Sequence, residues 1–281
     1  MLARDMQGRM IRFLLIGLVL VLGLFPSGAA ASPYGSILAF GDSLSANTGT
    51  GDGYEGRWTD EYVWVEYLAI KLGVELTDKA YENTTTSQLL TQVTSYLNTI
   101  SGTISSNTLV TVWAGGADLA CIVNDYGVTY TEAALKMKVV IETLIDKGAC
   151  NFVIPNLLNI GVIPNVISEL GGNYAGEASV WCQGFNAKLA KHLDDLKQSH
   201  SGVNFYTYDT YTMLTNMVAD PEAFGFNNKD AIFYKGFHPS SQTYAYLADQ
   251  VYSQIVPLPA SMLFFGSGLL GLVGIRRRIK G

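Results

Sequence analysis

Residues 36–45 read SILAFGDSLS, and this stretch decides the fold. Its first half is a short apolar run that ends at Gly41, which is typical of a buried strand. The chain then continues directly into Asp42 and Ser43. A serine just past the carboxyl end of a first strand is well placed to act as a nucleophile. Taken alone, the same residues also suit an ordinary turn, because Gly, Asp and Ser are common turn residues.

Segments of strand and helix character alternate through the rest of the chain. The strand-like runs are residues 74–80, 108–113, 151–154 and 203–208, and the helical segments are residues 64–72, 87–100, 131–147, 178–196 and 241–255. Because such alternation places helices on both faces of parallel strands, we expect a three-layer α/β/α domain with about five parallel strands. In such sheets the ligand binds at the carboxyl ends of the strands, near the switch in strand order. Ser43 lies at that edge.

Composition and charge exclude several classes of protein. The 281 residues are 48% hydrophobic and 11% aromatic, so the chain is not disordered and is long enough to bury a core. The two ends hold seven of the 18 basic and one of the 24 acidic residues, which leaves a net charge of −12 on residues 32–256. Arg57 is the only arginine among them. So acidic a domain repels phosphate backbones, and we exclude nucleic acid as a partner.

The first 31 residues have the three parts of a secretory signal peptide. Arg9 and Arg12 precede an apolar run over residues 13–25, and small residues then lead to an Ala-x-Ala site that ends at Ala31. We expect residues 1–31 to be this signal, with cleavage after Ala31. A membrane anchor is the alternative, but about 13 apolar residues are too few to span a bilayer comfortably.

Residues 256–281 form a second targeting segment. They begin with VPLPAS, continue with an apolar stretch over residues 260–275, and end in RRRIKG. The stretch makes a short, marginal membrane span, and the basic cluster would hold its end in the cytoplasm. This order of parts resembles the PEP-CTERM sorting signal, which implies transient membrane insertion and processing by an exosortase in a Gram-negative bacterium. A permanent anchor is the alternative. We expect residues 32–255 to be one exported domain, in the cell envelope or outside the cell.

Histidine and cysteine positions narrow the candidate chemistry. His238 stands in the segment GFHPS, where Pro239 and the following helix start fix a loop position that returns the ring to the active edge of the sheet. His192 and His200 fall on a lysine-bearing helix and in a polar turn, and we interpret both as solvated surface residues. No cysteine or histidine cluster suggests a metal site. Three cysteines are an odd number for an oxidising compartment, and spacing does not choose a disulfide pair among Cys121, Cys150 and Cys182.

Together these segments resemble the SGNH/GDSL hydrolase family over most of residues 36–255. GDSLS at 41–45 matches the first block of that family, VWAGGAD at 112–118 the third, and FHP at 237–239 the last. Further segments fit in the same order: GRW at 56–58, VWVEYLA at 63–69, VIPNL at 153–157 with Gly161 and Pro164, and PEAFG at 221–225. Among its branches, the chain is most similar to secreted lipases and esterases of the phospholipase, lecithinase and haemolysin type. The resemblance implies the flavodoxin-like fold of SGNH hydrolases.

The resemblance also implies catalytic roles. Ser43 is the expected nucleophile, which attacks an ester carbonyl. His238 is the expected general base, which takes the serine proton and later gives it to the alcohol leaving group. The backbone N–H groups of Ser43, Asn83 and Gly116 are the expected oxyanion donors. The expected substrate is an ester-bearing small molecule or a lipid, and neither a cofactor nor a metal is needed.

Three positions depart from the family pattern. Ala117 stands where an asparagine side chain should point at the oxyanion, and a methyl group donates no hydrogen bond. In the second block, Glu82 or Asn83 replaces a glycine, and a Glu82 carboxylate that faced the oxyanion would oppose it. Lys235 stands where an aspartate should accept the imidazole N–H, and an ammonium near His238 disfavours the imidazolium. The remaining candidates for that acceptor are a backbone carbonyl, Asp118 and Asp230.

Two functions follow from these residues. The first is an exported ester hydrolase, lipase- or esterase-like, that works by a Ser43–His238 dyad or a degenerate triad. Losing one oxyanion donor costs roughly 10²–10³ in rate, and losing the group that orients the histidine costs on the order of 10⁴. The alternative, which those losses would also suit, is a catalytically impaired member of the same fold, displayed at the cell surface, that binds lipid or polysaccharide. The intact pair of Ser43 and His238 favours the hydrolase.

Overall fold

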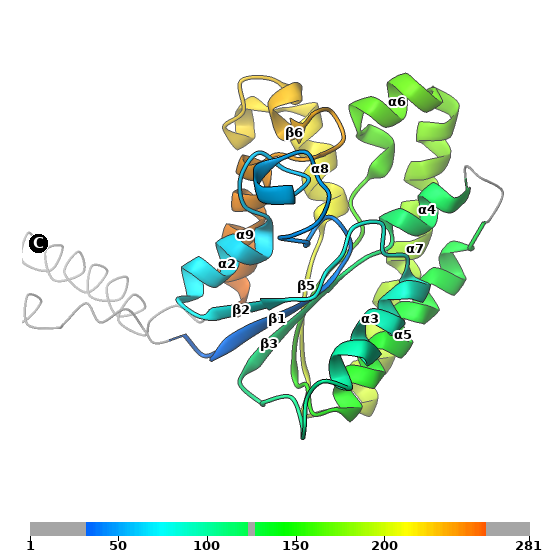
Figure 1. The fold of residues 1–281 in the computed structure, drawn as a ribbon. Helices are drawn as coiled ribbons and strands as arrows, with labels where there is room; N and C mark the ends of the chain where they lie inside the picture. The colour runs from blue at the N-terminus through cyan, green and yellow to red at the C-terminus, as the bar shows by residue number, and fades with distance from the viewer. Residues whose placement is uncertain (1–31, 123–126, 257–281) are drawn as a thin grey trace, which may run out of the picture. The chain divides into compact units, whose positions relative to one another are not determined.

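The computed structural model describes residues 32–122 and 127–256 (Figure 1). The predicted signal peptide, residues 1–31, and nearly all of the predicted sorting segment lie outside the described residues. Within the two described ranges, no helix is both long enough and apolar enough to cross a membrane. The predicted span over residues 260–275 is not part of those ranges.

Five parallel strands form one sheet in the order β2-β1-β3-β4-β5. The strands are β1 Ser36–Gly41, β2 Glu75–Asp78, β3 Thr108–Trp113, β4 Asn151–Pro155 and β5 Asn204–Tyr208. Because β1 pairs with β2 on one side and with β3 on the other, the strand order switches at β1. The register places Gly41 opposite Trp113, so the segments after β1 and β3 emerge side by side. The predicted five-stranded parallel sheet is confirmed.

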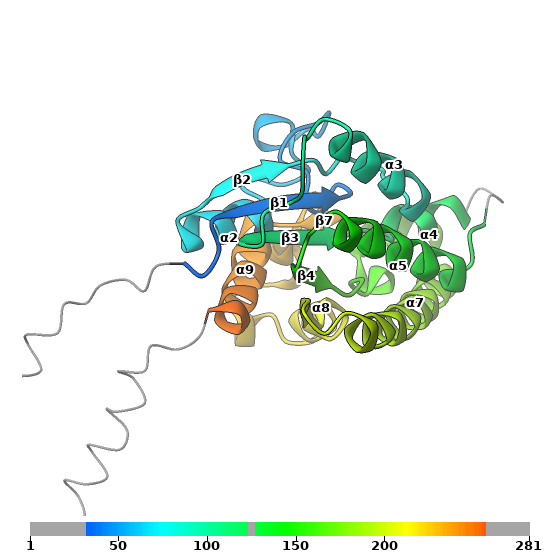
Figure 2. The same cartoon turned by 90° about the horizontal axis from the view of Figure 1, so that it is seen from below.

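Helices cover both faces of this sheet (Figures 1 and 2). They are α2 Trp64–Leu72, α3 Thr86–Leu97, α4 Gly116–Ile122, α5 Tyr130–Asp146, α6 Pro164–Leu170, α7 Gly172–Ser199, α8 Thr210–Ala219 and α9 Ser241–Ile255. One apolar core joins α2, α8 and α9 to the sheet, and a second joins α3, α5 and α7 to its other face. This arrangement confirms the predicted three-layer α/β/α fold.

Burial on both faces explains the composition of the central strands. Every residue of β3 is buried, as are the last five of β1. Strands covered by helices on both faces are apolar throughout rather than alternating, which is why residues 36–40 form a continuous apolar run. In the core beside α2, the rings of Trp64 and Trp113 meet edge to face with centroids 5.8 Å apart.

Short elements and one helix start differ from the sequence-based expectation. The structure adds α4, α6 and α8, the 3-10 helices η1 Tyr54–Gly56, η2 Ile160–Val162, η3 Glu222–Phe224 and η4 Lys229–Ile232, and a hairpin of β6 Phe233–Tyr234 with β7 His238–Pro239. Periodicity is weak evidence over so few residues. Helix α7 begins at Gly172 rather than at Ala178. Its glycines weaken local helix propensity by about 1 kcal/mol each, and packing against α5 keeps the segment helical.

Two further predictions about single residues are tested by the structure. His192 is half-buried rather than solvated: within the described ranges its Nδ1 atom is buried without a hydrogen-bond partner, and burial lowers the pKa of the ring. Cys150 and Cys182 are free thiols, and burial raises the pKa of Cys182 to about 12. The side chain of Cys121 lies outside the described part of the chain.

Candidate active site

The turn after β1 is held from three directions. Gly41 is required there, because its φ is +154° and a Cβ atom would clash with the carbonyl oxygen of Trp113. Gln92 of α3 clamps the same residue: its Oε1 accepts from Gly41 N at 3.0 Å, and its Nε2 donates to Gly41 O at 3.0 Å. Asp42 N donates to Trp113 O at 3.2 Å. These bonds hold the following residue, Ser43, at the carboxyl edge of the sheet.

Asp42 shapes the backbone around Ser43. Its Oδ1 accepts from Leu44 N at 3.0 Å, and its carbonyl oxygen accepts from the N–H groups of Ser45 and Ala46, each at 3.1 Å. Burial and the neighbouring Asp118 carboxylate raise the pKa of Asp42 to about 7, against the hydrogen bonds that favour the anion. The Asp42 side chain therefore belongs to the turn, not to the proton transfer.

The hairpin of β6 and β7 delivers His238 to the same edge. Tyr234 pairs with His238 across the hairpin, and α9 starts immediately afterwards with Ser240 as its N-cap. Nε2 of His238 lies 2.9 Å from Oγ of Ser43. The two residues that the sequence singled out are 195 positions apart and in hydrogen-bond contact.

Aromatic rings enclose the imidazole. Trp58 stacks on His238 with centroids 5.3 Å apart and an interplanar angle of 23°, and Phe237 meets it edge to face at 5.0 Å. Burial lowers the pKa of His238 to about 4, although the Asp52 and Glu82 carboxylates act in the opposite direction. The ring is therefore neutral at pH 7, the state that a general base requires.

No carboxylate accepts from Nδ1 of His238 within residues 32–122 and 127–256. Asp118 lies elsewhere: its two oxygens accept from Thr86 N and Thr86 Oγ1, both at 2.8 Å, at the start of α3. Asp230 is exposed on η4. The expectation that Asp118 or Asp230 accepts from Nδ1 of His238 is therefore wrong. Spacing along the chain does not reveal this, because the partner of Asp118 lies 32 positions away.

Lys235 does not act on His238 as expected. The residue has a left-handed backbone with φ of +48°, and its ammonium pairs with Asp52 on the exposed surface. Asp52 is the partner because Tyr234 Oη donates to its carbonyl oxygen at 3.0 Å, which docks the two loops together. The ion pair neutralises the charge of Lys235. The expectation that this lysine disfavours the imidazolium of His238 is therefore wrong.

Glu82 is also turned away from the predicted oxyanion hole. Its Oε2 accepts from Trp58 Nε1 at 2.5 Å, and its Oε1 accepts from Thr50 N at 3.3 Å and from Thr50 Oγ1. The next residue, Asn83, has φ of +56°, a left-handed conformation that Asn adopts more readily than most residues. Asn83 therefore has the left-handed backbone that a glycine adopts readily, and it lines the same cavity as Ser43.

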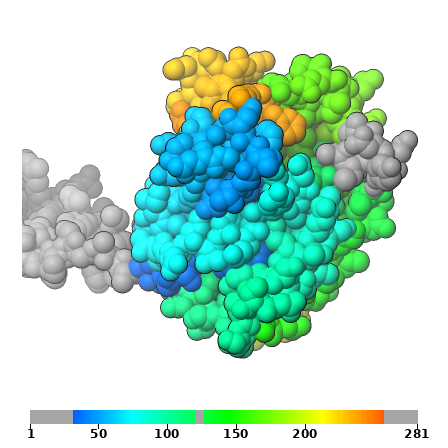
Figure 3. Space-filling model, viewed as in Figure 1, coloured from blue at the N-terminus to red at the C-terminus, as the bar shows by residue number. Residues whose placement is uncertain are grey.

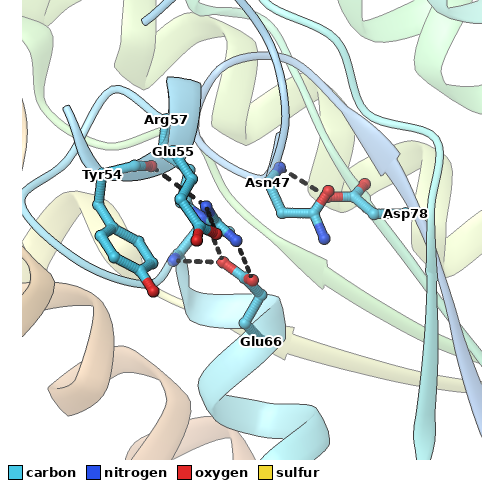
Figure 4. A network of polar contacts seen from close by, with 7 residues as sticks. Asn47, Tyr54, Glu55, Arg57, Glu66 and Asp78 are labelled. Carbon is cyan, nitrogen blue, oxygen red and sulfur yellow. Dashed lines mark hydrogen bonds and ion pairs between the residues drawn. The ribbon is translucent and has the colours of Figure 1, made fainter. Parts of the chain in front are cut away.

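The loop over residues 46–63 carries two residues, Arg57 and Trp58, for which the sequence alone indicated no role in the site. Arg57 binds Glu66 of α2 in two parallel hydrogen bonds of 2.8 and 2.7 Å, and it also donates to Tyr54 O at 3.1 Å (Figure 4). This pairing anchors the loop beside Trp58, whose ring lies over His238. The signal was present in the sequence, because Arg57 is the only arginine of residues 32–256 and such an arginine needs a partner when buried.

The loop and the histidine hairpin lie side by side on the surface. In Figure 3 the blue segment that contains residues 46–60 meets the gold and orange segments that contain residues 220–245. The contact of Tyr234 with Asp52 O belongs to this seam. Residues from the two ends of the domain therefore build one wall of the site.

A cavity of about 520 Å³ opens at the Ser43–His238 pair. Its lining includes the residues predicted to supply the oxyanion donors, Ser43, Asn83 and Gly116. Ala117, which departs from the family pattern, also lines it. The rest of its wall is mostly apolar, with Leu44, Leu119, Leu157, Leu158, Ile160, Ile163, Val166, Leu170, Tyr174, Leu214, Phe233 and Phe237. Within the described ranges, no group of three or more His, Cys, Asp or Glu side chains is placed to hold a metal ion.

Comparison with known sequences places the chain among esterases and lipases. The model of the GDSL-like lipase/acylhydrolase family matches residues 37–251. A GDSL esterase/lipase of Arabidopsis thaliana is 33% identical over 101 residues, which cover 34% of this chain and 27% of that relative. A second GDSL esterase/lipase from the same plant is 22% identical over 277 residues, and this match covers 82% of this chain and 79% of that relative.

Solved structures share the fold. A member of the lipolytic G-D-S-L family from Veillonella parvula has a TM-score of 0.51 at 17% identity, over 78% of this chain and 96% of that one. An acetyl xylan esterase from Geobacillus stearothermophilus has a TM-score of 0.52 at 12% identity, over 81% of this chain and 100% of that one. At such identities the likeness concerns the fold alone. Because the family model covers most of the chain, including Ser43 and His238, this protein belongs to the GDSL-like lipase/acylhydrolase family.

Proposed function

We propose that the protein is an exported serine ester hydrolase in which Ser43 is the nucleophile and His238 the general base. One observation carries the proposal: Ser43 Oγ and His238 Nε2 are 2.9 Å apart at the mouth of an apolar cavity. A hydroxyl that is hydrogen-bonded to a neutral imidazole at the edge of a cavity is the arrangement that activates a serine. Family membership supports the same chemistry.

The reaction proceeds in two halves. Ser43 Oγ bonds to the ester carbonyl carbon while its proton passes to Nε2 of His238. The tetrahedral intermediate then expels the alcohol, which takes that proton, and leaves an acyl-serine. Water attacks the acyl carbon and gives a proton to Nε2. The free acid leaves when this proton returns to Ser43 Oγ.

The oxyanion of the intermediate would be stabilised by backbone groups. The N–H groups of Ser43, Asn83 and Gly116 are the proposed donors, because all three residues line the cavity next to the nucleophile. Ala117 contributes no side-chain donor, which costs roughly 10²–10³ in rate. The lowered pKa of His238 makes its imidazolium about 3 kcal/mol harder to form than in water. We therefore expect slow turnover.

The cavity favours esters whose acyl part is apolar. Its volume of about 520 Å³ lies in the range of pockets that enclose small ligands. The substrate class we propose is carboxylic esters of small molecules or lipids, as in the secreted phospholipase, lecithinase and haemolysin branch. Among proteins of this fold, one acts on acetylated xylan, so acetyl esters belong in the assay.

Export rests on the two ends of the chain. We propose that residues 1–31 are a signal peptide, that residues 32–255 are the hydrolase domain, and that residues 256–281 are a PEP-CTERM segment. In this proposal the last segment inserts transiently in the membrane and is processed by an exosortase. The protein would then reside in the envelope of a Gram-negative bacterium or outside it. Sizing and mass spectrometry of the protein from its native host would locate both cleavage points.

A second candidate function is favoured by two observations. Ala117 offers no oxyanion donor, and His238 Nδ1 has no carboxylate acceptor within the described ranges. Both features suit a member of the fold that holds a lipid or polysaccharide at the cell surface without cleaving it. In that case Ser43→Ala leaves ligand affinity unchanged.

Hydrolysis of p-nitrophenyl acetate, butyrate and octanoate separates the two functions. We expect measurable turnover by the purified protein and none by Ser43→Ala, with stoichiometric labelling of Ser43 by a fluorophosphonate, because only an activated serine reacts quickly. Identical rates for the wild type and Ser43→Ala, together with no labelling, would overturn the hydrolase proposal and favour the binding protein.

A further inference from the structure

The imidazole of His238 lacks the usual means of orientation. A histidine base normally donates from Nδ1 to a carboxylate, which fixes its tautomer and stabilises the imidazolium. Here Lys235 stands where the family has that acid, and its ammonium is paired with Asp52. Within residues 32–122 and 127–256, no other carboxylate bonds to Nδ1. The ring still meets Ser43 at 2.9 Å, so other contacts must hold it.

Trp58 supplies one of those contacts, by stacking on the imidazole. Its ring lies nearly parallel to the imidazole, 23° from coplanar and 5.3 Å away between centroids. A parallel indole blocks rotation of the imidazole out of its plane and leaves Nε2 directed at Ser43. The face of an indole is also the best aromatic partner for a cation, so it favours the imidazolium over the neutral ring.

Glu82 fixes Trp58 and adds charge. Its Oε2 accepts from the indole N–H at 2.5 Å, which locks the Trp58 side chain over His238. The carboxylate is buried, and hydrogen bonds from Thr50 and Trp58 lower its pKa, so it is anionic at neutral pH. An anion bound at the indole N–H increases the negative charge that the ring presents to the imidazolium.

Two carboxylates near His238 both raise the pKa of its ring. Asp52 and Glu82 are the carboxylates that favour the imidazolium, and burial opposes them. Asp52 is exposed and compensated by Lys235, whereas Glu82 is buried and has only neutral donors. Of the two, Asp52 makes the larger contribution to the pKa of His238, whereas Glu82 is the carboxylate that also holds the indole stacked on the ring.

We propose that Trp58 and Glu82 are the positioning residues of His238 and replace the acid that the family places three residues before it. The indole holds the plane of the ring, and the carboxylate bound to the indole N–H stabilises the imidazolium through it. This inference rests on the proposed ester hydrolysis. It goes further by assigning the support of the imidazole to the 46–63 loop and the β2–α3 turn, instead of to the segment that precedes His238.

Four variants of the purified full-length protein test the assignment. Trp58→Leu removes the stack, and we expect kcat on p-nitrophenyl butyrate to fall about 10- to 30-fold with little change in KM. Trp58→Phe keeps a ring over the imidazole but loses the indole N–H that binds Glu82, so its kcat should lie between those of the wild type and Trp58→Leu. Glu82→Gln keeps an acceptor for the indole N–H but removes the charge. Glu61→Gln is the matched control on the loop that carries Trp58, and in the described part of the chain the Glu61 carboxylate accepts from Tyr67 Oη.

The direction of the His238 pKa distinguishes positioning from a loosened fold. Removing the Glu82 charge lowers the pKa of His238, because the carboxylate favours the charged ring. A merely structural loss admits water and raises that pKa toward 6.5, since burial is what depresses it. NMR titration of the imidazole nitrogens, assigned with His238→Gln, gives this direction without any turnover. We expect a lower pKa in Glu82→Gln and an unchanged one in Glu61→Gln.

The outcomes separate the two proposals. Turnover that depends on Ser43 but is the same in Trp58→Leu as in the wild type would overturn the positioning role. A pKa of His238 that is unchanged or higher in Glu82→Gln would also overturn it. Absence of Ser43-dependent turnover in the wild type is a failure of the proposed function, and the NMR titration then decides the role of Glu82 alone.

Discussion

The acid limit of hydrolysis is set by the burial of His238. A histidine in water has its midpoint near 6.5, whereas the aromatic enclosure lowers the pKa of His238 to about 4. The base must be neutral to accept the serine proton, so kcat/KM is lost as the pH falls through that value. At pH 5 about 90% of the rings are neutral with a pKa near 4, but only about 3% with a pKa near 6.5. We therefore expect nearly the full plateau rate at pH 5, where a solvated base would keep only about 3% of its own plateau rate.

The assay is the hydrolysis of p-nitrophenyl butyrate from pH 3 to 8, followed at the isosbestic wavelength of p-nitrophenol so that ionisation of the product does not contribute. Ser43→Ala supplies the background rate at each pH. Phe237→Ala exposes one edge of the imidazole, and we expect its acid limb to move up toward 6.5, because relief of burial favours the imidazolium. A wild-type limb already centred above about 6 would refute the reasoning, because it would mean that the ring is solvated.

Three further predictions concern the oxyanion hole, the cavity and stability. Ala117→Asn restores a side-chain donor at the cavity wall and should raise kcat by up to about 10²-fold in the butyrate assay; a lower kcat would show that the position does not face the oxyanion. Val166→Trp fills the buried wall on α6, so kcat/KM should fall at least about tenfold for octanoate and little for acetate; equal losses would contradict acyl binding there. Burial raises the pKa of Asp78 to about 7, so the native state holds a proton that the unfolded state has lost. That contribution, about 4 kcal/mol at most, is complete below pH 3.8 and is lost as pH rises toward 7. In urea unfolding at pH 5 and pH 8, Asp78→Asn should therefore show a smaller difference than the wild type, and an unchanged difference would contradict the raised pKa.

Much of the fold can be predicted from local sequence. Apolar runs that end in glycine, such as residues 36–41 and 108–115, mark the buried parallel strands because helices cover both of their faces. Capping sequences mark helix starts: Thr85 with Gln88 and Thr129 with Glu132 form capping boxes at α3 and α5. The short helices α4 and α6, the 3-10 helices and the β6–β7 hairpin escaped prediction, because too few residues lie on one face to produce a period. Helix α8, with ten residues, was also missed.

Local sequence patterns are enough to predict the layered parallel sheet, the serine after its first strand and the histidine before its last helix. The surroundings of that histidine depend on how the chain packs in three dimensions. Lys235 is paired with Asp52, Glu82 is bound to Trp58, and Asp118 is bound to Thr86. These pairs join residues 183, 24 and 32 positions apart. Periodicity and motifs report on neighbours along the chain, whereas the partner of a polar side chain depends on which loops the packed core brings together.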